Sequence, residues 1–221
     1  MLITCHGHSE FLIESASGFT LLTDPFNAEV GYRMEQYAVD AVAVSHGHGD
    51  HSFVEKAVSA DPGQPLTVIR QEGTYSLAEN VTVTAIPSYH DDVQGTKRGG
   101  NLLFRMEIDG LTLAHLGDIG APLTPQQRAA LGRVDILMLP VGGFFTIDAV
   151  QAKAIADQLR PAVLLPMHYK TAVNAQWPIA DAEAFLTLMA PQQAETCPIL
   201  RVTKGDLSEQ PPLILLKPSC I

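Results

Sequence analysis

The chain has 221 residues, 46% hydrophobic and 17% charged, so it can bury a sizeable core and is not expected to be disordered. Its formal net charge of −10 argues against a phosphate-backbone partner, and its only basic cluster is Lys97-Arg98. Three widely separated cysteines, Cys5, Cys197 and Cys220, favour a reducing compartment. We find no membrane-spanning apolar stretch and no signal-peptide pattern, so we expect a cytoplasmic protein that binds neither membranes nor nucleic acid.

The first half of the chain predicts short strands separated by turns. A first strand is expected over residues 2–5, and a turn then leads into a second strand that ends at residue 14. Further strands are expected over 19–23, 40–45, 66–70 and 81–86. The strand over 19–23 ends at Asp24-Pro25, because proline cannot continue a strand ladder. Ser52 and Glu55 have the spacing of a capping box, which predicts a helix that runs to about residue 60.

The second half predicts alternating strands and helices. A hairpin of strands 102–108 and 111–116 is expected around Asp109-Gly110, a typical type I′ turn. Strands over 135–140 and 162–166 alternate with helices that begin at Thr124-Pro125 and extend over 148–159 and 181–190, before short strands near 199–202 and 213–216. Two sheets with helices outside them, in one domain over 1–221, are the simplest packing.

One stretch concentrates ligand-type side chains. Directly after the apolar run 41–44, the sequence Ser45-His46-Gly47-His48-Gly49-Asp50-His51-Ser52 holds three histidines and one aspartate within six residues. Imidazole and carboxylate are ligands of divalent metals such as zinc and manganese. We expect Gly47 and Gly49 to allow backbone angles that let these side chains converge. A helix-capping role would explain one histidine but not all three, so we interpret the stretch as half of a two-metal hydrolytic site.

The other half of the site is expected from later strand ends. His90, Asp118 and His168 each follow a predicted strand, and loops at strand ends bring distant side chains to one rim. We expect two ligand groups bridged by Asp118: His46, His48 and His90 for one ion, and Asp50, His51 and His168 for the other. The donor set of five histidines and two aspartates suits zinc, with manganese or iron as alternatives.

These motifs resemble the metallo-β-lactamase superfamily in their residues and in their order. The resemblance implies an α/β fold: a four-layer αβ/βα sandwich with two central mixed sheets flanked by helices and metals at one edge of the sheets. It also implies that Asp24 supports the metal loop. Gly7-His8-Ser9-x-Phe11, Thr23-Asp24-Pro25-Phe26 and Pro166-Met167-His168-Tyr169 resemble a narrower subgroup, the bacterial and archaeal metal-dependent hydrolases related to ascorbate-6-phosphate lactonase.

The predicted function is metal-dependent hydrolysis of a small ester-, lactone- or phosphoester-type substrate. A metal-activated hydroxide would attack the substrate, and Asp50 would orient the water and accept its proton. A nuclease or phosphodiesterase is an alternative, disfavoured because the chain lacks a basic exosite. A di-iron redox site is a second alternative, although those proteins typically carry glutamate in place of His48. A non-enzymatic metal-binding role is a third alternative. The sequence also leaves open whether the chain forms a homo-oligomer.

Several further residues are candidates for supporting the metals or contacting substrate. His8 is equally consistent with either role and with a local turn bond. Arg98 and Asn101 could bind an anionic substrate group, and Tyr169 lies beside a predicted ligand. We expect Trp177 and Phe144-Phe145 to serve packing, although Gly142-Gly143 before the phenylalanines indicates a loop near the mouth of the site.

Overall fold

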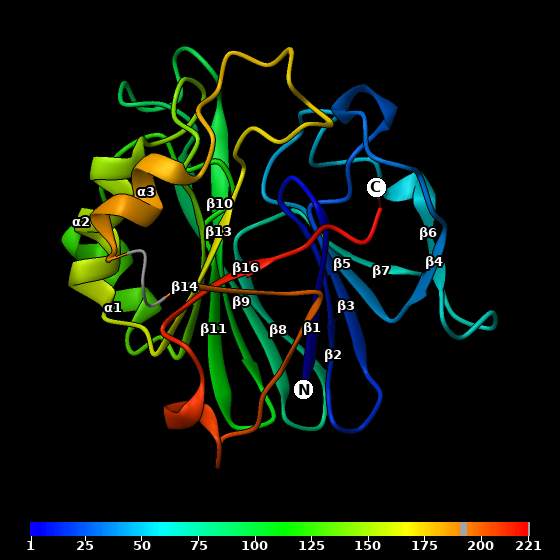
Figure 1. Cartoon of the computed structure of the whole chain (residues 1–221). Coiled ribbons are helices and arrows are strands. Elements are labelled where there is room, and N and C mark those ends of the chain that lie inside the picture. The colour runs from blue at the N-terminus through cyan, green and yellow to red at the C-terminus, as the bar shows by residue number, and fades with distance from the viewer. Residues whose placement is uncertain (191–193, 221) are drawn as a thin grey trace.

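Two β-sheets face each other in the computed structural model, which describes residues 1–190 and 194–220 (Figure 1). The six-stranded sheet has the order β15-β1-β2-β3-β5-β7. Its strands are β1 (Leu2–Gly7), β2 (Glu10–Glu14), β3 (Thr20–Thr23), β5 (Ala41–Ala43), β7 (Thr67–Ile69) and β15 (Ile199–Arg201). The sheet is mixed, because β3, β5 and β7 pair in parallel and the other neighbours are antiparallel.

The second sheet has eight strands in the order β14-β16-β13-β12-β11-β10-β9-β8. They are β8 (Gly73–Ala78), β9 (Val81–Tyr89), β10 (Gly100–Ile108), β11 (Leu111–His115), β12 (Ile136–Pro140), β13 (Val163–Met167), β14 (Ala194–Cys197) and β16 (Leu213–Leu216). Strands β8 to β11 form an antiparallel meander, and the other neighbours pair in parallel. The prediction of two mixed sheets is confirmed.

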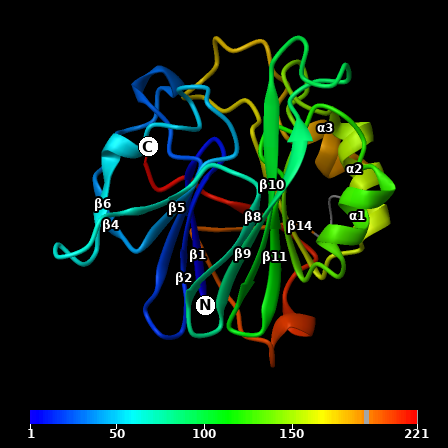
Figure 2. The same ribbon diagram turned by 180° about the vertical axis from the view of Figure 1, so that it is seen from behind.

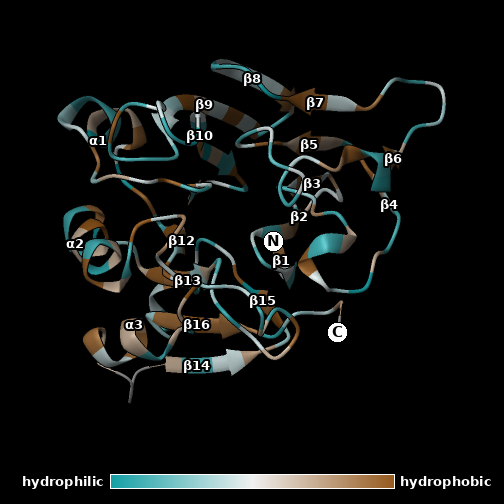
Figure 3. Ribbon diagram, turned by 90° about the horizontal axis from the view of Figure 1, so that it is seen from above, coloured by the Kyte–Doolittle hydropathy of each residue, from teal (hydrophilic) through white to brown (hydrophobic). Residues whose placement is uncertain are grey.

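The two outer faces are covered differently. The α-helices α1 (Pro125–Leu131), α2 (Ala149–Leu159) and α3 (Glu183–Leu188) lie along the eight-stranded sheet (Figures 1 and 2). The six-stranded sheet is covered by a two-stranded sheet of β4 (Tyr37–Val39) and β6 (Ala57–Ser59), seen on the opposite side of the molecule in Figure 3. The described residues also form 3-10 helices η1 (Ala28–Val30), η2 (Val54–Lys56) and η4 (Leu207–Glu209).

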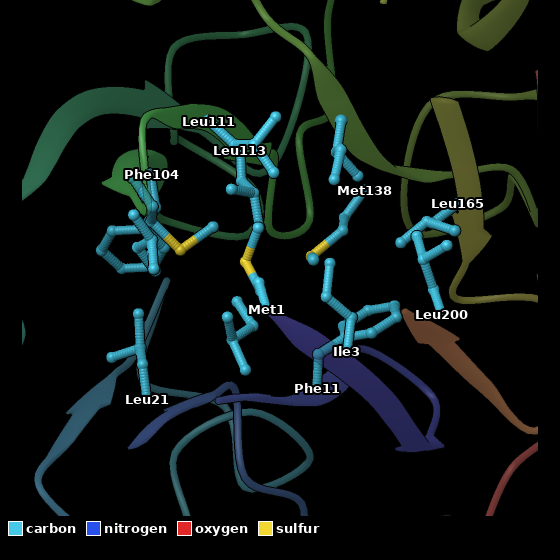
Figure 4. Close-up of a cluster of buried hydrophobic side chains, with 14 of the residues drawn as sticks. Met1, Ile3, Phe11, Leu21, Phe104, Leu111, Leu113, Met138, Leu165 and Leu200 are labelled. Atoms are coloured by element: carbon cyan, nitrogen blue, oxygen red, sulfur yellow. The ribbon is translucent and has the colours of Figure 1, made fainter. Parts of the chain in front are cut away.

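The main apolar core lies between the two sheets. Figure 4 shows Ile3, Phe11 and Leu21 of the six-stranded sheet pointing toward Phe104 and Met138 of the eight-stranded sheet. All five side chains are fully buried, and burying one such side chain stabilises the fold by roughly 1.5–3 kcal/mol. The two sheets are therefore held together over their facing surfaces, which gives the loops at their ends a rigid base.

Local signals account for two helix starts and one turn. Thr124 and Asp148 cap α1 and α2, each in a capping box with the glutamine three residues later. Asp109 and Gly110 have φ angles of 55° and 74°, as a type I′ hairpin turn requires. These predictions are confirmed.

The predicted helix over residues 52–60 is wrong. The chain forms only the single turn η2 and then enters β6, which pairs in parallel with β4. The Ser52 hydroxyl donates to the carbonyl of Gly47 instead of capping a helix. Lys56 is drawn into the interior, where its Nζ lies 2.7 Å from Glu10 Oε2 and 3.6 Å from the centre of the Phe26 ring. This buried tertiary ion pair outweighs the local helix signal.

Strands β4, β8 and β14 escape prediction because β4 and β14 have only three and four residues and β8 is largely exposed. In the part of the chain that the structure describes, no helix is long and apolar enough to cross a membrane.

Candidate metal centre

Six strands have their C-terminal ends at the same edge of the sandwich. In the six-stranded sheet β1, β3 and β5 run in the same direction, and in the eight-stranded sheet β9, β11 and β13 do so. The predicted ligands follow these strands: His46, His48, Asp50 and His51 after β5, His90 after β9, Asp118 after β11 and His168 after β13. Residues more than 100 positions apart in sequence thus meet at one rim.

The structure brings the seven predicted ligands together in the expected groups. Side-chain donor atoms of His46, His48 and His90 all lie within 4.8 Å of one another. Those of Asp50, His51 and His168 do the same, and this second group also contains His8. A third, overlapping group joins His46, His51 and Asp118.

Asp118 lies between the two groups. Its Oδ1 is 3.3 Å from His51 Nε2, while its Oδ2 is 3.2 Å from His90 Nε2 and 3.1 Å from His168 Nε2. One carboxylate therefore faces histidines of both groups, which is the position that a bridging ligand needs.

Asp24 holds the loop of residues 45–52, which carries four of the predicted ligands. This fully buried carboxylate accepts hydrogen bonds from the backbone N–H of Ser45 at 2.7 Å, the Ser45 hydroxyl at 2.6 Å and His51 Nδ1 at 2.8 Å. Burial raises the pKa of Asp24, but the bond from His51 outweighs it, and the pKa lies below its ordinary value. Because Nδ1 of His51 faces Asp24, Nε2 is the ring nitrogen that could bind an ion.

Buried atoms without partners test whether metal ions fit here. His46 Nε2 and Asp118 Oδ1 are buried and find no hydrogen-bond partner among the described residues. Such groups are costly unless something satisfies them, and both belong to a donor set of imidazole nitrogens and carboxylate oxygens. The residues present therefore fit divalent metal ions.

The protonation states of three groups at the site also suit metal binding. Burial lowers the pKa of His46 to about 3 and that of His8 to about 4, so both imidazoles are neutral at pH 7. Burial raises the pKa of Asp50, but contacts with His8 and His51 outweigh it and hold the pKa below its ordinary value. Metal ligands must be neutral histidines and ionised carboxylates, and His46, His8 and Asp50 already have these charges. Burial lowers the pKa of His51, but the carboxylates of Asp118 and Asp24 outweigh it and raise the pKa above its ordinary value, so this ring must lose a proton when an ion binds.

Asn101 supports the Asp118 turn and does not line the cavity described below. Its side-chain amide donates to the carbonyl of Leu116 at 3.0 Å and accepts from the backbone N–H of Asp118 at 2.9 Å. The side chain is buried and both of its polar atoms are bonded to backbone, and the contact with an anionic substrate group stays a prediction. Of the two predicted roles, support of the metal ligands is the one that the geometry favours.

Gly120 is a positioning residue that the sequence did not reveal. Its N–H donates to the carbonyl of Tyr89, the residue before His90, at 3.0 Å. A Cβ atom at Gly120 would lie 2.3 Å from the backbone nitrogen of Asp91. The Asp118 turn and the His90 loop therefore touch backbone to backbone, and only glycine fits between them.

The motif glycines act differently from the prediction. Neither Gly47 nor Gly49 has a φ in the left-handed region. A Cβ at Gly49 would lie 2.7 Å from Asn27 Nδ2, whereas a Cβ at Gly47 would meet nothing within 4 Å. Close packing accounts for Gly49, and nothing in the structure explains Gly47.

A cavity of about 390 Å³ opens above the ligands. Besides the ligands it is lined by Arg98, Phe145, Gln176, Trp177 and Pro178. The sequence predicts packing roles for Phe145 and Trp177, with Gly142-Gly143 as the one indication of a loop near the mouth of the site. The predicted candidate Tyr169 is absent from this lining. It packs against the core between the eight-stranded sheet and the helices, and burial raises the pKa of its hydroxyl.

Arg98 lies on the cavity wall, as the sequence predicts for an anion-binding residue. Its guanidinium donates to the carbonyl of Phe144 at 3.1 Å and lies 5.7 Å from the centre of the Phe145 ring. Asp91 holds the preceding loop by accepting four backbone N–H bonds, including that of Arg98 at 2.8 Å. No carboxylate among the described residues forms an ion pair with Arg98, so its charge is available to the cavity.

The fold and this ligand arrangement define a protein of the metallo-β-lactamase type. Residues 2–168 match the family model of the β-lactamase superfamily domain. A UPF0173 metal-dependent hydrolase from Carboxydothermus hydrogenoformans is 31% identical over 206 residues, which cover 83% of this chain and 88% of that protein. The chain therefore belongs to the metallo-β-lactamase superfamily, in the UPF0173 family of metal-dependent hydrolases.

Solved structures agree with this assignment. A metallo-β-lactamase superfamily protein from Thermotoga maritima has a TM-score of 0.77 and 31% identity, and the match covers 97% of each chain. Igni18, a metallo hydrolase from Ignicoccus hospitalis, shares the fold with a TM-score of 0.64 at 21% identity, over 86% of this chain and 91% of that one. The resemblance to the superfamily is confirmed, and the narrower one to ascorbate-6-phosphate lactonase stays a prediction.

Proposed function

We propose that the protein is a binuclear hydrolase that cleaves a small ester-, lactone- or phosphoester-type substrate. The observation that carries the proposal is the position of Asp118, whose two oxygens face histidines of both ligand groups at 3.1 to 3.3 Å. The family relationship to metal-dependent hydrolases supports it independently.

Each ligand has a part in the proposed reaction. When bound, two divalent ions would supply Lewis-acid chemistry and lower the pKa of water. His46, His48 and His90 would hold one ion, Asp50, His51 and His168 the other, and Asp118 would fix the distance between the two. The Asp50 carboxylate would also orient the attacking water and accept its proton, since it is ionised at neutral pH and its side chain is 23% exposed beside the cavity.

The cavity supports a small substrate with an apolar part and an anionic group. Phe145, Trp177 and Pro178 offer apolar walls, and Arg98 offers a planar cation that pairs well with carboxylate or phosphate. Arg98 is the only arginine or lysine in the described lining, whereas a polynucleotide substrate requires several phosphate contacts. The charge distribution thus favours a metabolite over a nucleic acid.

Zinc is the first metal to test, because the site offers the imidazole nitrogens and carboxylate oxygens that zinc binds. The Thermotoga maritima relative is also described as a candidate Zn-dependent hydrolase. Manganese and iron accept the same donors. The three unpaired cysteines support the cytoplasm as the compartment.

A metal analysis followed by a substrate screen tests the proposal. Protein purified without added metal would be analysed for metal content, and then loaded with zinc, manganese or iron and assayed on lactones, phosphoesters, thioesters and phosphodiesters. We expect two ions per chain and hydrolysis in one of these classes, with His48→Ala as the blank. A metal content far below one ion per chain, with no uptake on reconstitution, would overturn the proposal.

A further inference from the structure

His8 reaches the second ligand group from the turn between β1 and β2. It has a φ of 56°, and its side chain is fully buried. Its carbonyl accepts a bond from the backbone N–H of His168 at 3.1 Å. The His8 ring packs beside the His168 ring, with centroids 4.2 Å apart, and beside Trp177 at 5.1 Å. Both the backbone and the ring are therefore held in place.

The distances around His8 Nε2 are those between donors that share one ion. His8 Nε2 lies 3.2 Å from His51 Nε2 and 3.3 Å from Asp50 Oδ2, and the last two atoms are 3.6 Å apart. With metal–ligand bonds of about 2.0–2.2 Å, neighbouring donors lie about 3.3–3.6 Å apart on a tetrahedral ion and about 2.8–3.1 Å apart on an octahedral one. The measured distances are close to the tetrahedral spacing and somewhat longer than the octahedral one. His8 is thus as close to the predicted ligands as these are to one another.

A plain hydrogen bond explains this contact less well. His51 donates its Nδ1 proton to Asp24, so Nε2 is the nitrogen that would bind an ion, after losing its own proton. Once His51 Nε2 is engaged by an ion, it has no lone pair left to accept a proton from His8. The remaining non-ligand role for His8 is a hydrogen bond to Asp50 Oδ2, which would position that carboxylate.

We propose that His8 is a direct ligand of the second metal ion, in addition to Asp50, His51, His168 and the bridging Asp118. This inference rests on the proposed binuclear site and adds a ligand to one half of it. The two halves then differ: the first ion has three histidines and the bridge, which suits tetrahedral zinc, whereas the second has five side chains. Five protein donors favour metals that accept five or six ligands, such as manganese or iron.

Metal titrations of His8 variants test the proposal. Chelator-treated protein would be titrated calorimetrically with Zn²⁺ and separately with Mn²⁺, and its metal content measured after desalting. His8→Ala removes the ring, whereas His8→Gln keeps an N–H donor for Asp50 but is a poor ligand. His6→Ala is the matched control, because His6 is a buried imidazole near the end of β1, bonded to Glu10 at 2.9 Å and outside the ligand groups.

We expect wild type to bind two ions and both His8 variants to bind one of them at least about 100-fold more weakly, the upper end of the loss seen for outer-shell partners. His48→Ala should weaken binding of the other ion. The double variant His8→Ala/His48→Ala should weaken binding of both ions. The visible absorption of the Co²⁺-loaded protein should change in His8→Ala but not in His6→Ala, because the number of ligands falls.

Two results would overturn the ligand role while leaving the proposed function intact. One is wild-type affinity for both ions in His8→Ala, and the other is full recovery of affinity in His8→Gln, which would assign His8 to positioning Asp50. Wild-type protein that binds a single ion would instead refute the binuclear function itself, and the His8 proposal with it.

Discussion

At the scale of single residues, the candidate metal centre consists of the predicted ligands and of side chains that hold these ligands in place. Asp24, Ser45 and Asn101 are buried and direct their polar atoms at the backbone or rings of ligand residues. The family resemblance predicts this role for Asp24. Nothing in the sequence predicts it for Ser45, because a serine beside a histidine motif carries no distinctive signal.

Asp24→Asn should weaken metal binding by about 10–100-fold, the range for outer-shell partners of a ligating histidine. An amide in this place offers one acceptor where Asp24 now accepts from three donors, so His51 would lose its fixed orientation. Competition with a chromogenic chelator measures the affinity.

Asp40→Asn is the control for the Asp24 variant, because Asp40 also accepts from a backbone N–H and a hydroxyl, both of Thr20, away from the ligands. Equal metal affinity in the two variants would contradict the anchoring role.

Arg98→Gln should raise KM for anionic substrates about 10–100-fold, since a charged hydrogen bond contributes about 1.5–3 kcal/mol. Substrates without an anionic group should change little. Steady-state kinetics on matched charged and neutral esters measure the difference, with Lys97→Gln as control because Lys97 is exposed and pairs with Asp92. A uniform effect on both ester types would refute anion recognition by Arg98.

At the scale of elements, the site is an assembly of strand ends held together by close backbone contacts. The turn after β11 and the loop after β9 meet at Gly120, and the turn after β1 is bonded to the backbone of His168 after β13. The strand order alone brings these loops to one edge, but the contacts between loops set the distances between ligands.

Gly120→Ala should separate the Asp118 turn from the His90 loop. The new Cβ would lie 2.3 Å from Asp91 N and 2.4 Å from the His90 carbonyl carbon, and overpacking of this kind costs about 1–3 kcal/mol. Urea unfolding of the metal-free protein measures the loss of stability, and metal titration measures the loss of affinity.

Gly47→Ala is the matched control for Gly120→Ala, since its Cβ would meet nothing within 4 Å although it lies between two predicted ligands. If Gly47→Ala weakened metal binding as much as Gly120→Ala, the backbone contact at Gly120 would not be the cause.

At the scale of the whole molecule, the sheets share an apolar core, and a few buried polar links far from the metals tie the chain together. Asp135, just before β12, is one of them. It accepts from Lys204 Nζ at 2.7 Å and from the backbone N–H of Thr112 at 3.0 Å, and lies 3.3 Å from Arg133 Nε. Burial raises the pKa of Asp135, but these partners outweigh it and hold the pKa below its ordinary value of 3.8.

Asp135→Asn should lower the free energy of unfolding at pH 7 by about 1–3 kcal/mol. Because the folded pKa is depressed, the wild-type carboxylate stabilises the fold fully above its ordinary pKa and loses this contribution as the pH falls through the folded value. The free energies of unfolding of the variant and the wild type should therefore begin to converge near pH 4 and meet below the folded pKa of Asp135.

Urea unfolding of the metal-free protein between pH 7 and pH 2 measures this convergence. Asp157→Asn is the control, since the exposed Lys153–Asp157 pair should contribute about 0.3–0.5 kcal/mol. A constant difference between Asp135→Asn and wild type across the pH range would contradict the depressed pKa.

The sequence by itself determined the chemistry of the site and the class of fold. Metal-ligand types are a property of side chains, and the rule that ligands follow strands is local, so the order of residues alone suffices to group His46 to His51 with His90, Asp118 and His168. Apolar periodicity and caps likewise predict most strands and the starts of α1 and α2. These signals need only neighbouring residues.

The tertiary structure decided which distant residues meet. It placed His8 beside His51, put Phe145 and Trp177 on the cavity wall, withdrew Asn101 and Tyr169 from it, and replaced a predicted helix with η2 and β6. Each outcome depends on packing between segments that lie far apart in the chain, such as the Lys56–Glu10 pair across 46 positions. Contacts of that kind leave no periodic trace in the sequence, because their energy arises only when the chain is folded.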